Sequence, residues 1–241
     1  MTEINMDKEL RNEIKISAKE ILNSKYIIAS TGAGISTESG IPDFRGPGGA
    51  WRSIGGLIKM VVKTPTAKPN PGHYALAELE KIGILKCLIT QNIDNLHRAA
   101  GSRNVIEFHG NMYKLRCTKC NTRFGIFDFG AMRAHRSRCK GIVKPDTVMF
   151  GEPIPPDALQ NAFDEAERCD CLIVAGTSSV VYPAAALIPR AKRNNARIIE
   201  VNAEETGMTR SVSDHFLKGK TGEILPSLVD EIETIERGEI G

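Results

Sequence analysis

The sequence predicts an α/β fold built on a doubly wound parallel sheet. Short apolar segments rich in β-branched residues alternate with longer segments whose apolar residues recur at helical spacing, and this alternation favours parallel strands. Small or polar residues directly follow five of the expected strands. Because ligands of such sheets bind at the carboxyl ends of the strands, these five segments indicate one shared binding site.

Each expected element rests on a local pattern. The N-terminal helix, over 7–23, is expected from apolar residues at helical spacing: Leu10, Ile14, Ala18, Ile21 and Leu22. The first buried strand is expected over 25–30. Further strands are expected over 85–90, 104–108, 170–175, 197–201 and 215–218. Further helices are expected over 69–80, 95–100, 155–168, 183–194 and 221–236.

Two stretches lack this pattern and are interpreted as insertions into the sheet domain. They are residues 46–68, which follow a glycine-rich segment, and residues 111–145, which are basic and have little periodicity. The sheet domain is therefore expected in three parts, over 1–45, 69–110 and 146–241.

The composition excludes several classes of protein. Hydrophobic residues make up 41% of the chain and charged residues 25%, which is ordinary for a globular protein. The net charge of +3 is too small to indicate nucleic-acid binding, so direct binding is not expected. No apolar run approaches the ~20 residues that span a bilayer, and residues 1–19 are too polar for a secretory signal. We expect a cytoplasmic protein with no membrane partner, and no residue pattern indicates its oligomeric state.

The segment from Thr31 to Arg45, T-G-A-G-I-S-T-E-S-G-I-P-D-F-R, follows the first strand. Gly32 and Gly34 carry no Cβ, so the backbone can turn sharply there and approach a ligand. A glycine turn between a strand and a helix can point N–H groups at phosphate. A complete G-x-G-x-x-G fingerprint would need glycine at Thr37, so this part also fits a tight turn without a ligand. The following G-I-P-D-F-R adds an acid, a base and an aromatic ring, which a turn does not need.

These residues resemble the signature of the sirtuins, the NAD-dependent protein deacylases. The motifs G-A-G-I-S, G-I-P-D-F-R, Q-N-I-D, H-G, F-G-E and G-T-S occur in the family's order between about Lys25 and Val229. The resemblance implies a Rossmann-like sheet with a small zinc-binding module and a short helical cofactor-loop insertion. It also implies NAD as co-substrate and an acyl-lysine protein or peptide as substrate.

The resemblance places NAD at the strand ends. Ser36, Asn92 and Asp94 would hold the nicotinamide end and Phe44 would screen it, although Asn and Asp also cap helices well. The full NAD-binding set that the resemblance implies is Gly32, Ala33, Gly34, Ser36, Asp43, Phe44, Arg45, Trp51, Gln91, Asn92, Ile93, Asp94, Gly176, Thr177, Ser178, Asn202, Ala203, Glu204 and Thr221.

His109 and Asn92 are the catalytic residues that the resemblance implies. A histidine at a strand end is more often a core hydrogen-bonding group, but Gly110 leaves room beside the ring, and a pKa near neutrality suits a general base. In the implied reaction the acyl oxygen attacks C1′ of the nicotinamide ribose and nicotinamide leaves. The histidine then deprotonates a ribose hydroxyl, and water completes the transfer to give lysine and O-acyl-ADP-ribose.

Three alternatives remain beside deacylation. Mono-ADP-ribosyl transfer uses the same activation of NAD, and a regulator would bind NAD with little turnover. A dehydrogenase is disfavoured because no substrate domain follows the nucleotide-binding half. Residues 52–68 are shorter than in most sirtuins and lack the tyrosine–arginine pair of desuccinylases, so neutral acyl groups are expected.

Residues Val148, Met149, Phe150 and Gly151 form part of V-M-F-G-E. In the resemblance this strand binds the substrate peptide by β-augmentation. A buried strand without that role is the alternative.

A metal site is expected in the basic insertion. Cys117-Thr-Lys-Cys120 has the spacing of a zinc knuckle, and Cys139 stands at the family's fourth-ligand position. The third-ligand position holds Arg136, which cannot bind a metal, and His135 precedes it. We expect a structural zinc on Cys117, Cys120, His135 and Cys139, with a water ligand or a metal-free module as the alternatives.

Overall fold

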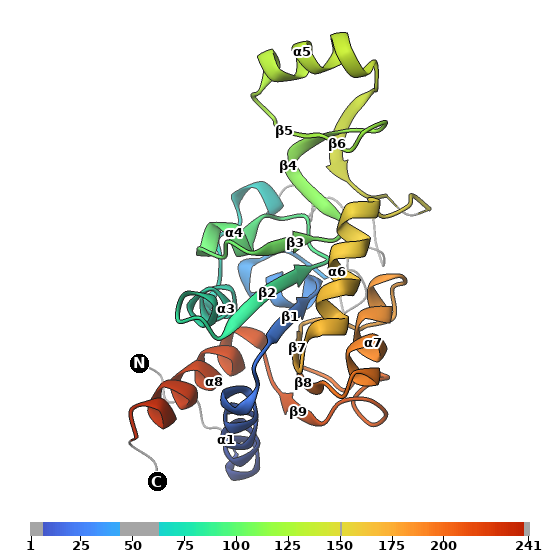
Figure 1. Cartoon of the computed structure of the whole chain (residues 1–241). Helices are drawn as coiled ribbons and strands as arrows, with labels where there is room; N and C mark the ends of the chain where they lie inside the picture. Colours follow the sequence, from blue (N-terminus) through green and yellow to red (C-terminus); the bar gives the residue numbers. More distant parts are fainter. Residues whose placement is uncertain (1–6, 44–62, 150, 239–241) are drawn as a thin grey trace.

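The computed structural model describes residues 7–43, 63–149 and 151–238, and a six-stranded sheet forms its body (Figure 1). The strand order is β3-β2-β1-β7-β8-β9, and every pair in it is parallel. The strands are β1 (Ile27–Thr31), β2 (Leu85–Thr90), β3 (Val105–Glu107), β7 (Cys171–Ala175), β8 (Arg197–Asn202) and β9 (His215–Lys218). The chain winds outward on both sides of β1, so the predicted doubly wound sheet is confirmed and its switch point lies between β1 and β7.

Helices cover both faces of this sheet (Figure 1). One face packs against α1 (Lys8–Asn23), α3 (Pro71–Lys81) and α8 (Thr221–Glu236). The other face packs against α6 (Pro156–Arg168) and α7 (Leu187–Arg193). Strands β1 and β7 are buried at every position because both faces are covered. Within the described ranges, no helix is long and apolar enough to cross a bilayer.

Helix starts follow the polar residues that precede them. The Asp7 carboxylate accepts a hydrogen bond from the Glu9 N–H at 2.7 Å and so caps α1, and Asn70 caps α3 in the same way. The glycine turn after β1 leads directly into the 3₁₀ helix η1 (Ala33–Ser39). Short helices also occur as η2 (Thr64–Thr66), α4 (Leu96–Ala100) and η3 (Ala184–Ala186), the last of which takes the first turn of the helix expected over 183–194.

A smaller module projects from the sheet domain, and α5 lies at its far end (Figure 1). Its elements are β4 (Gly110–Cys117), β5 (Arg123–Gly125), α5 (Phe129–Cys139) and β6 (Val143–Thr147). The three strands form an antiparallel sheet in the order β5-β4-β6. We call residues 110–147 the projecting module. Most of the other expected insertion, residues 46–62, lies outside the described residues.

Ion pairs hold the base of the projecting module, and one of them reaches the sheet domain. The Asp146 carboxylate is fully buried and accepts from the Nε atoms of Arg116 at 2.8 Å and Arg123 at 2.9 Å. Arg123 also donates to Asp157 in α6 at 2.6 Å. Gly110 lies beside this cluster with φ +84°, and a Cβ there would lie 1.9 Å from the Asp146 carbonyl oxygen. The junction is therefore a tight polar contact.

Replacing Asp146 should weaken this junction strongly. Asp146→Asn leaves the buried Arg116 guanidinium without its counter-charge, and breaking such a pair costs about 3–5 kcal/mol. Asp157→Asn is the matched control, because that carboxylate is 46% exposed and an exposed pair contributes less than about 1 kcal/mol. Urea unfolding of both variants measures the difference, and equal losses would contradict the assignment.

Candidate functional site

The turns after β1 and β7 lock together at the switch point. The Gly34 N–H donates to the Gly176 carbonyl oxygen at 2.7 Å, and the Gly32 N–H donates to Ala175 at 3.3 Å. A Cβ on Gly34 would lie 2.7 Å from that Gly176 oxygen, and Gly176 itself has φ +60°. The two glycine-rich turns therefore meet backbone to backbone, which larger residues would prevent.

Ser36, Asn92 and Asp94 form one hydrogen-bonded cluster beside these turns. The Ser36 hydroxyl donates to the Asp94 carboxylate at 2.7 Å. The Asn92 side-chain N–H₂ donates to Ser36 at 3.0 Å and to the Gly32 carbonyl at 3.1 Å. The three polar residues predicted to hold one ligand end are thus brought together from η1 and the turn after β2. The Asp94 carboxylate also accepts from the Leu96 N–H, the first of α4 (Leu96–Ala100), at 2.9 Å, although the N-cap residue of that helix is Asn95.

His73 completes the hydrogen bonding of Ser36. The His73 Nδ1 accepts from the Asn70 N–H at 3.3 Å, so in the neutral ring the proton lies on Nε2, which is 3.5 Å from the Ser36 oxygen. Ser36 therefore donates its one proton to Asp94 and accepts from Asn92 and His73. With all three positions used, the direction of the hydroxyl is determined.

Burial sets the charges around this cluster. Desolvation raises the pKa of Asp94, although the Leu96 N–H and the Ser36 hydroxyl partly offset that effect. Desolvation lowers the pKa of His73 to about 4 and lowers the pKa of His97 well below its usual value, so both rings are neutral near pH 7. The His97 Nε2 lies 2.9 Å from the Thr31 hydroxyl at the end of β1.

His109 lies across the same edge of the sheet. Its Nδ1 is 2.9 Å from the Gln91 carbonyl oxygen, which can only accept, so the neutral ring carries its proton on Nδ1 and keeps a lone pair on Nε2. Desolvation lowers the pKa of His109. The Gln91 side chain donates to the Thr177 hydroxyl at 3.2 Å, which ties the turn after β2 to the turn after β7.

The predicted residues from the last third of the chain lie at the neighbouring strand ends. The Asn202 side chain donates to the Thr177 carbonyl at 2.8 Å, whereas Ser178, Ala203 and Glu204 are exposed. Ser179 follows Ser178 with a hydroxyl that is buried without a partner among the described residues.

Thr221 contacts η1 from the start of helix α8. It begins α8, and its hydroxyl lies 3.5 Å from the Glu38 carboxylate of η1, which also accepts from the Gly222 N–H at 2.8 Å. The N-terminus of α8 therefore meets the segment that carries Ser36.

Of the residues expected to bind a peptide, Val148 contacts His109, and the described ones lie outside any strand. The Val148 N–H donates to the His109 carbonyl at 2.9 Å, whereas β6 ends at Thr147, so the strand expected over 148–150 is wrong for Val148 and Met149. A turn closed by the Glu152 N–H on the Met149 carbonyl at 2.9 Å ends the extended run, and Gly151 enters it with φ +81°. Met149 is exposed.

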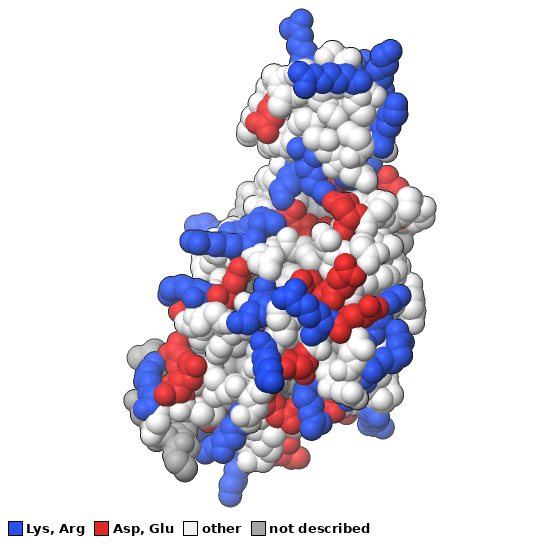
Figure 2. All heavy atoms as spheres, in the orientation of Figure 1, with Lys and Arg blue, Asp and Glu red and all other residues white. Residues whose placement is uncertain are grey.

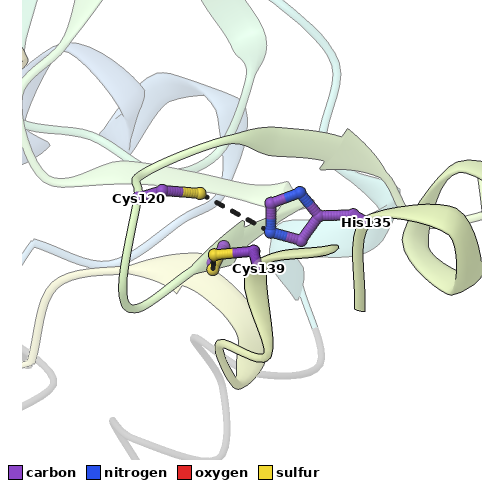
Figure 3. A group of neighbouring side chains, drawn as sticks. Cys120, His135 and Cys139 are labelled. Atoms are coloured by element: carbon purple, nitrogen blue, oxygen red, sulfur yellow. Dashed lines mark hydrogen bonds between the residues drawn. The ribbon is translucent and has the colours of Figure 1, made fainter. Parts of the chain in front are cut away.

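Cys117, Cys120, His135 and Cys139 come together as one cluster. Their ligand atoms all lie within 4.8 Å of one another, and Figure 3 shows His135 of α5 directed at Cys120 with Cys139 beside them. The Cys117 and Cys139 sulfurs are 3.8 Å apart, and Cys120 Sγ is 3.5 Å from His135 Nε2. Sulfur ligands at about 2.3 Å from a tetrahedral zinc would stand about 3.8 Å apart, so the donor set fits that metal.

The backbone also shapes this cluster. The N–H groups of Cys120 and Lys119 lower the pKa of Cys117, which favours the thiolate that binds metal. A Cβ on Gly141 would lie 2.4 Å from the Cys117 sulfur, so only glycine lets the chain pass there. Arg136 is exposed and takes no part in the cluster.

Comparison with known proteins identifies the family. The sequence profile of the Sir2 family matches residues 56–183, which is more than half of the chain. An NAD-dependent protein deacylase of Thermococcus sibiricus is 41% identical over 247 aligned positions, covering 91% of this chain and 96% of that protein. The chain belongs to the Sir2 family. The similarity of this sirtuin to its relative therefore extends over nearly the whole chain and is not limited to the motifs.

Two solved structures are similar to this sirtuin in fold. A Sir2 homolog–NAD complex is 40% identical with a TM-score of 0.73, covering 96% of this chain and 95% of its own. A Sir2 protein bound to a myristoylated histone peptide is also 40% identical, with a TM-score of 0.71 and coverages of 95% and 99%. The Rossmann-like fold expected from the resemblance is confirmed.

The remaining candidate residues of this sirtuin divide into two groups. Phe44, Arg45, Trp51 and Phe150 lie outside the described residues. The others are Gly32 directly after β1, Ala33 at the start of η1, Asp43 after η1, and Ile93 in the turn after β2.

Sequence reasoning missed four residues that shape the sites. His73 orients Ser36, His97 contacts Thr31, Glu38 joins η1 to α8, and Gly141 makes room for a thiol. The helix-capping role of Asn70 was visible in the sequence and could have drawn attention to the histidine three residues later.

Substituting Gly34 should force the two turns apart. In Gly34→Ala the new methyl group meets three backbone atoms of Gly176 within 2.9 Å, and such overpacking costs about 1–3 kcal/mol. Gly207→Ala is the matched control, since no atom lies within 4 Å of its Cβ position, and a change within about 0.5 kcal/mol is expected. Thermal unfolding of both variants tests this, and an unchanged Gly34→Ala protein would show that the contact is loose.

Proposed function

We propose that this sirtuin is an NAD-dependent protein-lysine deacylase that releases nicotinamide and O-acyl-ADP-ribose. The observation that carries this proposal is the Ser36–Asn92–Asp94 cluster at the switch point, with the neutral His109 at the same edge of the sheet. The names of its relatives support the same activity, as do the NAD and acyl-peptide complexes of similar Sir2 structures.

The chain's own groups fit NAD at the strand ends. NAD would supply the ribose carbon that the acyl oxygen attacks and the hydroxyl that receives the acyl group. Asn92 uses its N–H₂ on Gly32 and Ser36, which leaves its side-chain oxygen to accept from a carboxamide. The unpartnered Ser179 hydroxyl lies in the segment proposed for phosphate and ribose, where a polar ligand would satisfy it.

His109 is the proposed general base. The Gln91 carbonyl holds the proton on Nδ1, so Nε2 is the atom that would take a proton from a ribose hydroxyl. Because burial lowers its pKa, the ring stays neutral and basic at pH 7 without first losing a proton. Asn92 is proposed to orient the reacting end of NAD, and exclusion of water from the site would protect a cationic transition state.

We propose an acyl-lysine peptide as the second substrate. The backbone of Val148 is hydrogen-bonded to His109 at 2.9 Å, so a peptide bound along 148–151 would place its lysine beside the base. Residues 52–68 lack the tyrosine–arginine pair that marks desuccinylases in the family, which supports neutral acyl groups as the preferred substrates.

The products test the proposal. The protein incubated with NAD and an acetyl-lysine peptide should release nicotinamide and O-acetyl-ADP-ribose, measured by mass spectrometry. His109→Ala should lower kcat by about 10²–10⁴, the usual contribution of a general base. Transfer of ADP-ribose to protein instead of deacylation would identify a mono-ADP-ribosyltransferase, and NAD binding without any product would identify a regulator.

The pH profile checks the role of His109 independently. Activity should be retained at high pH and fall as pH drops through the lowered pKa, with a midpoint below the ordinary histidine value of about 6.5. An acidic limb centred above that value, or one that persists in His109→Ala, would assign the titration to another group.

We propose zinc as the metal of the four-residue cluster, in a structural role. Three thiolates and one imidazole occupy all four tetrahedral positions, so no position is left for a reacting water. The ion pairs at Asp146 hold the base of the projecting module, whereas α5 buries no residue, so the metal would supply the cohesion of the outer half.

The identity of the third ligand can be tested directly. His135→Ala should lose the single zinc per chain, as counted by mass spectrometry of the native protein. Arg136→Ala, at the neighbouring position, should keep it. Retention of zinc by His135→Ala would show that a water or another side chain completes the site.

We propose the cytoplasm as the compartment of this protein. None of the six cysteines, all of which lie among the described residues, forms a disulfide, which supports a reducing environment.

A further inference from the structure

The net charge of +3 conceals an uneven distribution. Residues 111–145 contain nine Lys or Arg residues and a single acid, Asp128, which gives this segment a net charge of +8. The rest of the chain carries 23 basic and 28 acidic residues, a net charge of −5. Figure 2 shows the same contrast, with blue side chains around the projecting module and mixed colours over the body.

The nine basic residues fall into two groups. Lys114, Arg116, Arg123 and Lys144 pair with carboxylates near the root of the module and so belong to the junction. The other five have no acidic partner among the described residues, and all five are exposed: Lys119, Arg133, Arg136, Arg138 and Lys140. The free charge therefore gathers at the tip.

Helix α5 carries three of these five charges, its C-cap residue Lys140 carries a fourth, and all four side chains are exposed. No residue of the helix is buried, and its half-buried positions include the ligands His135 and Cys139. Phe129, Arg133, Arg136 and Lys140 follow at intervals of four, three and four residues, which places them along one side of the helix. Phe129 is 68% exposed, so an aromatic ring stands at the end of a basic stripe.

We propose that the tip of the projecting module, defined as Lys119 and residues 129–140, binds the phosphate backbone of nucleic acid. A stripe of unpaired Arg and Lys along one helix is the electrostatic pattern of such a surface. The net charge of the whole chain gave no reason to expect nucleic-acid binding. The concentration of positive charge at one end of the molecule does. This proposal does not depend on the deacylase function.

A nucleic acid fits this surface better than an acidic protein does. The single acid of residues 111–145, Asp128, accepts a hydrogen bond from the Gly125 N–H at 2.8 Å. The tip therefore offers almost no carboxylate to the basic groups of a protein partner. An acidic patch on a protein also complements a basic surface, but duplex nucleic acid continues its negative charge along its whole length, at about one charge per 1.7 Å, and so matches cations spaced along a helix. Three of the five free cations are arginines, whose planar group binds phosphate through two donors.

The test compares two triple variants that remove the same charge from the full chain. Arg133→Gln, Arg136→Gln and Arg138→Gln remove three cations from the tip. Lys8→Gln, Arg11→Gln and Lys19→Gln remove three exposed cations from α1, which have no ion-pair partner among the described residues. Binding of a short duplex DNA is followed by fluorescence anisotropy between about 50 and 200 mM salt.

The wild type should bind the duplex with an affinity that falls steeply with salt. The tip variant should bind about tenfold or more weakly at low salt, and its slope of log affinity against log salt should shrink by about three. The α1 variant should match the wild type. Equal weakening by both triples, or no binding by the wild type at low salt, would overturn the proposal.

A competition with polyglutamate distinguishes nucleic acid from acidic protein. Polyglutamate that displaces the DNA at equal charge concentration would show a general preference for acidic chains and overturn the nucleic-acid assignment. Polyglutamate that leaves the DNA bound supports it.

Zinc content and activity distinguish lost charge from a damaged module. Both the zinc content of the tip variant and its activity on an acetyl-lysine peptide should stay at wild-type levels. If the zinc content falls, Arg133→Gln alone, which is adjacent in sequence to none of the four cluster residues, replaces the triple and should lower the salt slope by about one.

Discussion

The contact between Gly34 and Gly176 is the constraint on which the rest of the site depends. Strand β1 pairs in register with β2 on one side and β7 on the other, with Thr31 opposite both Thr90 and Ala175. The three following turns therefore leave the sheet at one level. Only glycine at positions 34 and 176 allows the Gly34 N–H to reach the Gly176 carbonyl oxygen at 2.7 Å. That contact holds η1 where Ser36 can hydrogen-bond to Asn92 and Asp94 after β2.

From that contact a polar network extends through the interior. Buried polar groups cost free energy unless they are hydrogen-bonded, and Ser36 has a partner for its proton and for both lone pairs. Because burial keeps the rings of His73 and His97 neutral, they take part in this network without an unpaired charge. The result is a wall of fixed donors and acceptors, so a ligand meets groups whose directions are already set.

The sheet domain could be predicted from the sequence because apolar periodicity determines it. Strand β2 and helix α8 have the expected bounds, and β9 matches residue for residue. The strands of the projecting module were not expected, since ion pairs around Asp146 hold its junction and no apolar pattern marks them. Ser36, Asn92 and Asp94 were identified through motif resemblance, but His73 was not, because nothing local distinguishes it from a histidine that only caps its own helix.

The exposure of α5 has a consequence for how this protein can change over time. In most helices a surface residue shares its turn with core residues, so substitutions are limited by packing on the opposite face. In α5 no position is buried, and only His135 and Cys139 belong to the four-residue metal-binding cluster. Descendants of this chain can therefore vary nine of the eleven helical residues with little cost to the fold.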